Sequence, residues 1–192
     1  MGKEKYQDKI INLFEKSPVV DYSSIKRIIN NPEYAKQLIR NLVLKKKIKK
    51  LTKGFYTKHD EPSLIVFCFK PSYLGLQDSL SMHNLWEQET IPVVITSKKI
   101  RSGLRKMNGI NILIRRIDKK YLLGYDSLKV GEFYLPYSDI EKTLIDMVYF
   151  KQKISPETLK NIKLNLNKPK LKKYLQIYPK TFRKKVLLLV ME

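Results

Sequence analysis

The chain has 192 residues, of which 43% are hydrophobic and 30% charged, and its formal net charge is +21. That length and apolar fraction are enough for one large domain or two to three small ones, each with a buried core. No apolar run approaches the roughly 20 residues needed to cross a bilayer, and the polar stretch Met1–Lys9 is unlike a signal peptide. We therefore expect a globular cytoplasmic protein with no membrane partner.

Positive charge is concentrated at the two ends of the chain. Residues 1–59 contain 15 Lys and Arg against 5 Asp and Glu, residues 60–150 contain 12 against 11, and residues 151–192 contain 12 against 2. Neutralising phosphates with such side chains releases condensed counterions and so favours binding. Lysine-rich surfaces of thermostable proteins are the alternative, but these usually balance Lys with Glu. The distribution therefore predicts a nucleic-acid partner.

Three helices are predicted near the N-terminus. Apolar residues recur at helical spacing over Lys5–Lys16, and a short second helix follows over Ile25–Ile29. A third helix begins with Asn31 as its N-cap and Pro32 at its first position, both of which are favoured there. The helices are followed by two short strands, Ile48–Leu51 and Phe55–Thr57, joined by a turn that contains Gly54.

This order of elements predicts a winged helix-turn-helix over residues 1–59, which would bind DNA. After the linker Asp60-Glu61-Pro62, residues 60–150 predict a mixed α/β domain, and residues 151–192 predict a basic helical C-terminal tail. The fold class is therefore α+β. The expected strands of the middle domain are Leu64–Phe69, Ile91–Thr96, Ile110–Ile117 and Lys129–Leu135, and its expected helices are Leu74–Leu85 and one capped by Ser138 or Asp139.

The C-terminal tail is predicted to form three short helices. Ser155 caps the first, with Pro156 at its first position, the second lies within Asn167–Tyr178, and Pro179 opens the third.

The sequence offers little for catalysis. The two histidines, His59 and His83, lie on different predicted elements without a carboxylate at ligand spacing, and the single cysteine, Cys68, lies in an apolar run. No glycine-rich turn leads from a strand into a helix, as phosphate binding would require. The acidic residues of the Asp139–Asp146 segment are better explained as favourable charges at a helix start than as a catalytic pair. We expect no catalytic residue, no metal, no cofactor and no enzyme activity.

The candidate DNA contacts lie in the predicted winged segment. The polar face of its third helix is suited to reading base edges in the major groove, although a solvated face is the ordinary alternative. Ser23 and Ser24, at the start of the second helix, would bind a backbone phosphate, and Lys53 would reach a phosphate or the minor groove from the hairpin turn. The third-helix candidates are Tyr34, Lys36, Gln37, Arg40 and Asn41. Further nucleic-acid or partner contacts are expected at Arg115, Arg116, Lys172, Lys173, Arg183 and Lys184.

Four segments of the chain together resemble the AbiEi abortive-infection antitoxin family. They are Lys53–Tyr56 (KGFY), Tyr73–Leu85 (YLGLQDSLSMHNL), Val93–Thr96 (VVIT) and Leu135–Asp146 (LPYSDIEKTLID). Where the family usually has glycine after the histidine, this chain has Asn84, which tolerates the left-handed conformation. Where the family often has Pro-Glu-Lys-Ala, this chain has Asp139–Thr143.

The resemblance implies a two-part transcriptional regulator of a viral defence system. A winged domain would repress its own operon at inverted repeats, and the following domain would antagonise a nucleotidyltransferase-like toxin without being a catalyst. Its partners would be operator DNA, that toxin and a second copy of the chain.

Two alternatives remain open. One is a free-standing winged-helix regulator whose middle domain senses a ligand or dimerises. The other is an RNA-binding factor, favoured by Arg115-Arg116 and the basic tail, although the sequence has neither an RNP aromatic signature nor a GXXG loop.

Overall fold

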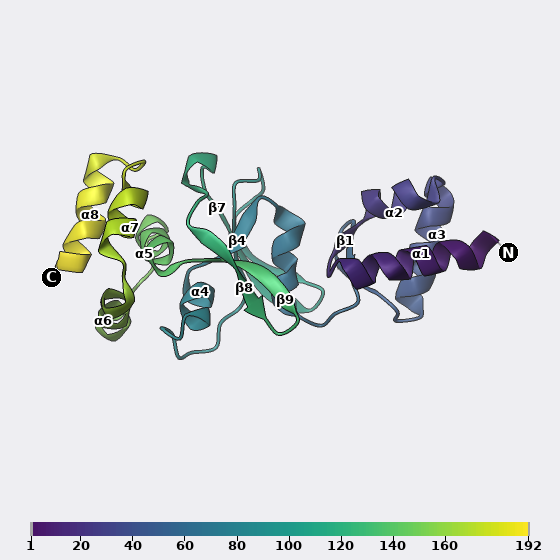
Figure 1. Cartoon of the computed structure of the whole chain (residues 1–192), viewed down its shortest axis with the longest axis horizontal. Coiled ribbons are helices and arrows are strands. Elements are labelled where there is room, and N and C mark those ends of the chain that lie inside the picture. The colour runs from purple at the N-terminus through teal and green to yellow at the C-terminus, as the bar shows by residue number, and fades with distance from the viewer. Residues whose placement is uncertain (1, 192) are drawn as a thin grey trace. The chain divides into compact units, whose positions relative to one another are not determined.

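The computed structural model describes residues 2–191, which divide into two compact units (Figure 1). One unit ends at Cys68 and also takes in Lys106–Ile110, and the other comprises Phe69–Arg105 and the chain from Asn111 onward. The structure is mixed α+β, as expected. The boundary lies nine residues beyond the one predicted at residue 59, and no boundary separates the C-terminal helices from the sheet. None of the helices described is long and apolar enough to cross a membrane.

The N-terminal unit has three helices and a small antiparallel sheet of order β1-β3-β2. Its helices and hairpin lie where the sequence predicts them, and Asn31 caps the third helix with Pro32 at its start. Strand β1, which pairs with β3, was not expected. The elements are α1 (Gly2–Lys16), β1 (Val20–Asp21), α2 (Tyr22–Ile29), α3 (Pro32–Leu44), β2 (Lys49–Thr52) and β3 (Phe55–Thr57). They enclose a core that includes Ile10, Phe14, Ile25, Leu38 and Leu42.

The next segment corrects one prediction from the sequence. Residues 62–69 form the 3-10 helix η1 (Pro62–Phe69) instead of a strand over Leu64–Phe69. Leu64, Ile65 and Val66 are all buried, and a continuous apolar run fits a buried helical turn as well as a buried strand.

The second unit is built on a six-stranded mixed sheet of order β6-β7-β5-β4-β9-β8. Strands β4 and β5 are antiparallel, β5 pairs with β7 and β4 with β9 in parallel, and β8 and β9 are antiparallel. The strands are β4 (Ser72–Leu74), β5 (Val93–Thr96), β6 (Gly103–Met107), β7 (Ile110–Arg116), β8 (Tyr125–Val130) and β9 (Phe133–Ser138), with the 3-10 helix η2 (Lys119–Tyr121) between β7 and β8.

Two further predictions in this unit were wrong. The helix expected over Leu74–Leu85 is only α4 (Gln77–Met82), because its first residue belongs to β4 and Leu76 has a positive φ of 57°. The single strand expected over Lys129–Leu135 is a hairpin of β8 and β9, which turns at Gly131 with φ of 57°.

Four helices complete the second unit: α5 (Ile140–Tyr149), α6 (Pro156–Asn165), α7 (Lys168–Leu175) and α8 (Lys180–Met191). Asp139, Ser155 and Asn167 cap the first three, and the first two of these caps were predicted from the sequence. The basic tail is an integral part of this unit, because its apolar side chains share a core with the sheet and α5. The core residues that join them include Leu144, Ile145, Ile162, Leu171, Leu175 and Val186.

Candidate nucleic-acid interface

Helix α3 buries one face and presents the other to solvent. The buried side chains recur every three or four residues and are Ala35, Leu38, Ile39 and Leu42. Four of the five candidate contacts lie between them and are exposed, namely Lys36, Gln37, Arg40 and Asn41. The fifth, Tyr34, is half-buried and packs edge-on against Tyr6 of α1, with ring centroids 6.1 Å apart.

The two cations on this face are in different electrostatic states. The Nζ atom of Lys36 lies 2.7 Å from Oε1 of Glu33, and this hydrogen bond raises the pKa of Lys36. Arg40 has no ion pair with any residue of the described chain. The Arg40 charge is therefore fully available to a polyanion, whereas that of Lys36 is already partly neutralised.

The start of α2, where Ser23 and Ser24 were expected to bind a phosphate, is capped by Asp21. Oδ1 of Asp21 accepts a hydrogen bond from the Ser24 N–H at 2.9 Å, and Oδ2 accepts one from the Ser24 hydroxyl at 3.0 Å. Burial raises the pKa of Asp21, but hydrogen bonds from Ser24 and Ser23 and the nearby Arg27 outweigh this and hold it below the ordinary value. Ser24 thus serves the cap, and Ser23 is the exposed serine.

The β2–β3 hairpin presents Lys53 at its turn. Gly54 follows with φ of 79°, a conformation that favours glycine, and its carbonyl accepts a hydrogen bond from the Tyr22 N–H at 2.8 Å. Lys53 is exposed and has no ion pair with the described residues. By contrast, Lys49 pairs with Asp60 and Lys58 with Glu15.

A groove of about 280 Å³ lies between α3 and the hairpin. Its cationic residues are Lys36, Arg40 and Lys50, and the rest of its lining is Tyr22, Ile39, Val43, Leu44 and Tyr56. Burial raises the pKa of Tyr56 above its ordinary value. The cations of this groove can attract a phosphate backbone.

The six candidates outside the N-terminal unit are spread over three elements. Arg115 of β7 is half-buried, with its guanidinium carbon 5.9 Å from the ring centroid of Phe150 and its Nε buried without a hydrogen-bond acceptor. Arg116 is exposed on the same strand. Lys172 and Lys173 are exposed on α7, and on α8 Lys184 is exposed while Arg183 is half-buried. Arg183 and Lys184 share one surface, and Arg115 is chiefly a packing residue.

A buried polar network surrounds α5. Nζ of Lys142 lies 2.5 Å from Oδ1 of Asp146, both side chains are fully buried, and the Tyr73 hydroxyl donates to Oδ2 of Asp146 at 2.7 Å. Lys142 also donates to the Tyr178 hydroxyl at 3.1 Å. Burial raises the pKa of Asp146 and lowers that of Lys142, and their mutual attraction opposes both shifts.

The acidic residues at the start of α5, Asp139 and Glu141, have structural partners and both pair with Lys170. Asp139 caps the Lys142 N–H at 2.8 Å, accepts a hydrogen bond from the Tyr174 hydroxyl at 2.8 Å and pairs with Lys170 at 2.9 Å. Burial and then this hydrogen bond raise the pKa of Tyr174 to about 12. Glu141 accepts from the Asn167 N–H at 2.7 Å. The capping role predicted for Asp139 is confirmed, whereas the role of Asp146 as a buried counter-ion was missed.

The histidines are not arranged around a common centre. His83 Nε2 lies 2.9 Å from the carbonyl oxygen of Ser138, and His59 is half-buried in the segment after β3. Among the residues described, no group of three His, Cys, Asp or Glu side chains is placed to hold a metal ion. Cys68 is buried, as its apolar surroundings in the sequence indicated.

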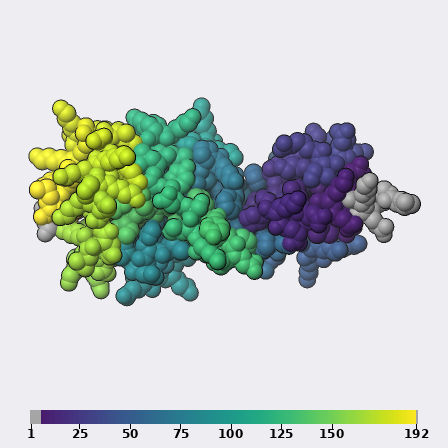
Figure 2. Space-filling model, viewed as in Figure 1, coloured from purple at the N-terminus to yellow at the C-terminus, as the bar shows by residue number. Residues whose placement is uncertain are grey.

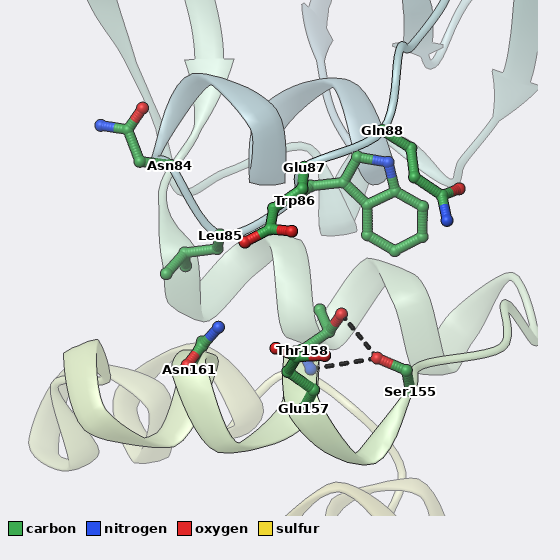
Figure 3. A pocket seen from close by; sticks show the side chains of 9 residues that line it. All are labelled: Asn84, Leu85, Trp86, Glu87, Gln88, Ser155, Glu157, Thr158 and Asn161. Carbon is green, nitrogen blue, oxygen red and sulfur yellow. Dashed lines mark hydrogen bonds between the residues drawn. The ribbon is translucent and has the colours of Figure 1, made fainter.

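A separate cavity of about 190 Å³ lies in the second unit (Figure 3). The segment after α4 contributes Trp86 and Glu87, which face Glu157 and Asn161 of α6. Neither carboxylate has an ion-pair partner in the described part of the chain, and no Lys or Arg lines the cavity. The other lining residues are Asn84, Leu85, Gln88, Ser155 and Thr158.

Comparison with known proteins adds a likeness of fold. The chain is similar to the crystal structure of the RV2827C protein from Mycobacterium tuberculosis, with a TM-score of 0.64. The two share a fold. The match covers 97% of this chain and 76% of the RV2827C chain, at 13% sequence identity. No known family profile and no curated protein sequence matches the chain.

Sequence reasoning missed several residues of the groove. Lys50 and Tyr56 are direct cross-strand partners, because the β2–β3 register shifts between Lys50 and Thr52. A simple hairpin around Lys53-Gly54 would pair Leu51 with Tyr56 instead, so the irregularity sets which residues line the groove. Leu44, at the end of α3, is 69% exposed, and an isolated apolar residue of this kind carries no signal in a sequence.

Proposed function

We propose that the N-terminal unit is a winged helix-turn-helix and that the protein is a sequence-specific transcriptional repressor. In this proposal α3 enters the major groove of duplex DNA and the β2–β3 hairpin is the wing. The observation that carries it is the unpaired Arg40, which shares the exposed face of α3 with Gln37 and Asn41. Arginine pairs with guanine and glutamine or asparagine with adenine, so this face has the donors and acceptors that base reading requires.

The adjoining groove supports the same proposal. Lys50 lines the groove together with Arg40, and Lys53 extends the positive charge to the hairpin turn. A phosphate backbone alongside α3 would meet these cations, which would fix the orientation of the helix without reading sequence.

The antitoxin role belongs to this proposal but has a different basis. It rests on the resemblance of the four segments to the AbiEi family, by which the second unit would antagonise a nucleotidyltransferase-type toxin. Asn84, which stands where that family usually has glycine, adopts a left-handed φ of 58°, so the local backbone requirement is the same. Co-expression with any nucleotidyltransferase that a neighbouring gene encodes, scored by colony survival, tests this role.

DNA binding is tested by fluorescence anisotropy with the whole chain at one salt concentration. The probes are duplexes tiled across the region upstream of the gene, a scrambled duplex of equal length and a structured RNA. We expect one upstream duplex to bind about 1,000-fold more tightly than the scrambled one, which is the lower range for specific recognition. Tighter binding to the RNA would favour the RNA-binding alternative and overturn the proposal.

The cavity shown in Figure 3 favours a second candidate function, regulation by a small cationic ligand. Trp86 offers a ring face and Glu87 and Glu157 offer unpaired carboxylates, which are the groups that bind an ammonium or guanidinium. Calorimetric titration with putrescine and arginine, and with the Glu157→Gln variant, tests this alternative. An absence of heat with both ligands would remove it.

A further inference from the structure

Helix α8 has an exposed face on which apolar and cationic side chains are mixed. The helix is anchored through Val186, which is fully buried, and its outward surface forms a shallow hollow of about 450 Å³. The residues that line this hollow are Lys180, Arg183, Lys184, Leu187, Leu188 and Met191, and we refer to them as the α8 face. The helix forms part of the yellow surface of the second unit in Figure 2.

The apolar residues of the α8 face are unusually accessible. Leu188 is 48% exposed and Met191 82%, and both lie next to Leu187 within one turn of helix. Single exposed apolar residues are common on protein surfaces, but neighbouring ones within a concave area mark interaction sites.

The cations of the α8 face also lack partners. None of Lys180, Arg183 and Lys184 forms an ion pair with a side chain of residues 6–191, and Nε of Arg183 is buried without a hydrogen-bond acceptor. An acidic side chain docked on this face would pair with the exposed ammonium groups of Lys180 and Lys184. The α8 face therefore combines exposed apolar side chains with cations that have no ion-pair partner among the described residues.

We infer that the α8 face docks an acidic segment of a partner protein, one that carries apolar side chains between its carboxylates. A nucleic-acid backbone would satisfy the cations but leave Leu188 and Met191 in water. A second copy of the chain would bring like charges together, because residues 151–192 contain 12 Lys and Arg against 2 Asp and Glu. An acidic amphipathic segment complements both the charge and the apolar surface.

This inference does not depend on the proposed DNA binding and can be tested separately. The probe is a fluorescein-labelled 14-residue helical peptide in which Glu and Leu share one face, and the comparison peptide has every Leu replaced by Ser. Anisotropy with the whole chain should show binding of the Leu peptide about tenfold tighter than that of the Ser peptide. Equal affinities would reduce the interaction to non-specific charge attraction and overturn the inference.

Variants locate the binding on the molecule. Leu188→Ser and Lys184→Gln should each weaken binding of the Leu peptide about fivefold. Leu164→Ser on α6 is the matched control, because Leu164 is 75% exposed and lies outside the α8 face. Unchanged melting temperatures verify that the variants fold. Peptide binding that survives Leu188→Ser, or falls equally with Leu164→Ser, would overturn the assignment.

Two further probes test whether the α8 face binds nucleic acid or a membrane instead of an acidic peptide. A 20-base-pair duplex whose own affinity falls with Leu188→Ser would assign the α8 face to nucleic acid. Phosphatidylserine vesicles that bind through Leu188, in the absence of peptide binding, would assign it to a membrane. Either result overturns the inference, whereas duplex affinity unaffected by Leu188→Ser, together with the peptide results above, supports it.

Discussion

Helices α3 and α5 begin alike and then differ in what they do with their polar residues. Each starts after a side-chain cap, Asn31 in one and Asp139 in the other, and each has a glutamate in its first turn. Five polar residues of α3 are exposed, whereas every residue of α5 from Glu141 to Val148 is buried. Polar residues on an amphipathic helix therefore form a potential binding surface in one unit and an internal network in the other.

The difference lies in the partners that the rest of each unit supplies. Around α5, Tyr73, Tyr174 and Tyr178 bring hydroxyl groups to the buried charges. No comparable group covers Arg40. Removing a charge from α5 should therefore affect folding, and removing one from α3 should affect binding.

The largest expected effect is on the buried pair. Asp146→Ala leaves Lys142 buried without its counter-ion and should lower the free energy of unfolding of the second unit by about 3–5 kcal/mol. Urea unfolding followed by the fluorescence of Trp86, which lies in this unit, measures it.

Two variants serve as controls for the buried pair. Removing both charges in Lys142→Met with Asp146→Leu should restore most of the loss, because apolar replacements of similar size often match a buried ion pair. Asp126→Ala, an exposed position on β8, should change stability by no more than about 0.5 kcal/mol. A loss of stability well below this range for Asp146→Ala would show that the polar residues of α5 do not serve folding as proposed, and would contradict the contrast with α3.

The next effect concerns base reading by α3. Arg40→Ala and Gln37→Ala should each weaken binding of the specific upstream duplex by about 1–3 kcal/mol and leave binding of the scrambled duplex nearly intact. Lys36→Ala should cost less, because Glu33 already pairs with this lysine. Anisotropy titrations on both duplexes provide the measurement. Equal losses on the two duplexes would show that these side chains contact phosphates and do not read bases.

A smaller effect is expected at the cap of α2. Asp21→Ala should destabilise the N-terminal unit by about 1 kcal/mol at pH 7. Because the pKa of Asp21 is lower in the folded state than its ordinary 3.8, its stabilising contribution is complete above that pH and is lost as the pH falls through the folded value. Urea unfolding followed by circular dichroism should show a weaker pH dependence below about pH 4 for this variant.

Asp21→Asn is the matched variant for that experiment. Asparagine keeps a capping oxygen but has no charge to titrate, so it should retain most of the stability at pH 7 and lose the same part of the pH dependence. If the wild-type acid transition is unchanged in both variants, Asp21 does not contribute to it.

The smallest effect is expected at the hairpin turn. Lys53→Ala should weaken binding of specific and scrambled duplexes alike and reduce the slope of log affinity against log salt by about 0.9, the value for one phosphate contact. Lys49→Ala should change the slope less, since Lys49 already pairs with Asp60. Affinities measured at several salt concentrations test this, and an unchanged slope for Lys53→Ala would place this residue away from the DNA.

Local signals explain what could be predicted from the sequence. Asn31-Pro32 and Ser155-Pro156 identify helix starts because a capping side chain and a preset φ act within a few residues. The same reasoning located the exposed face of α3. It failed at η1 and β1, since an apolar run lacks periodicity and a two-residue strand exists only through its pairing with β3.

Contacts made across long stretches of chain were beyond this reasoning. The bond from Tyr73 to Asp146 joins residues 73 positions apart, and the bond from Lys142 to Tyr178 spans 36. In neither bond does the sequence around one residue indicate which residue will be its partner. The same holds for the α8 face, where the exposure of Leu188 depends on which side of the helix the core covers.

The contact between Lys142 and Tyr178 also bears on the order in which the two units fold during synthesis. The buried cluster of the N-terminal unit ends at Ile48, with Tyr56 packed against it, so it can form while most of the chain is still to be translated. The second unit must wait, because Leu175, Tyr178 and Val186 belong to the same core as Tyr73 of β4. Until those residues leave the ribosome, the charge of Lys142 lacks its final hydrogen-bond partner and the apolar faces of the sheet lack their cover. The nascent second unit would then be the part of the chain most dependent on chaperones.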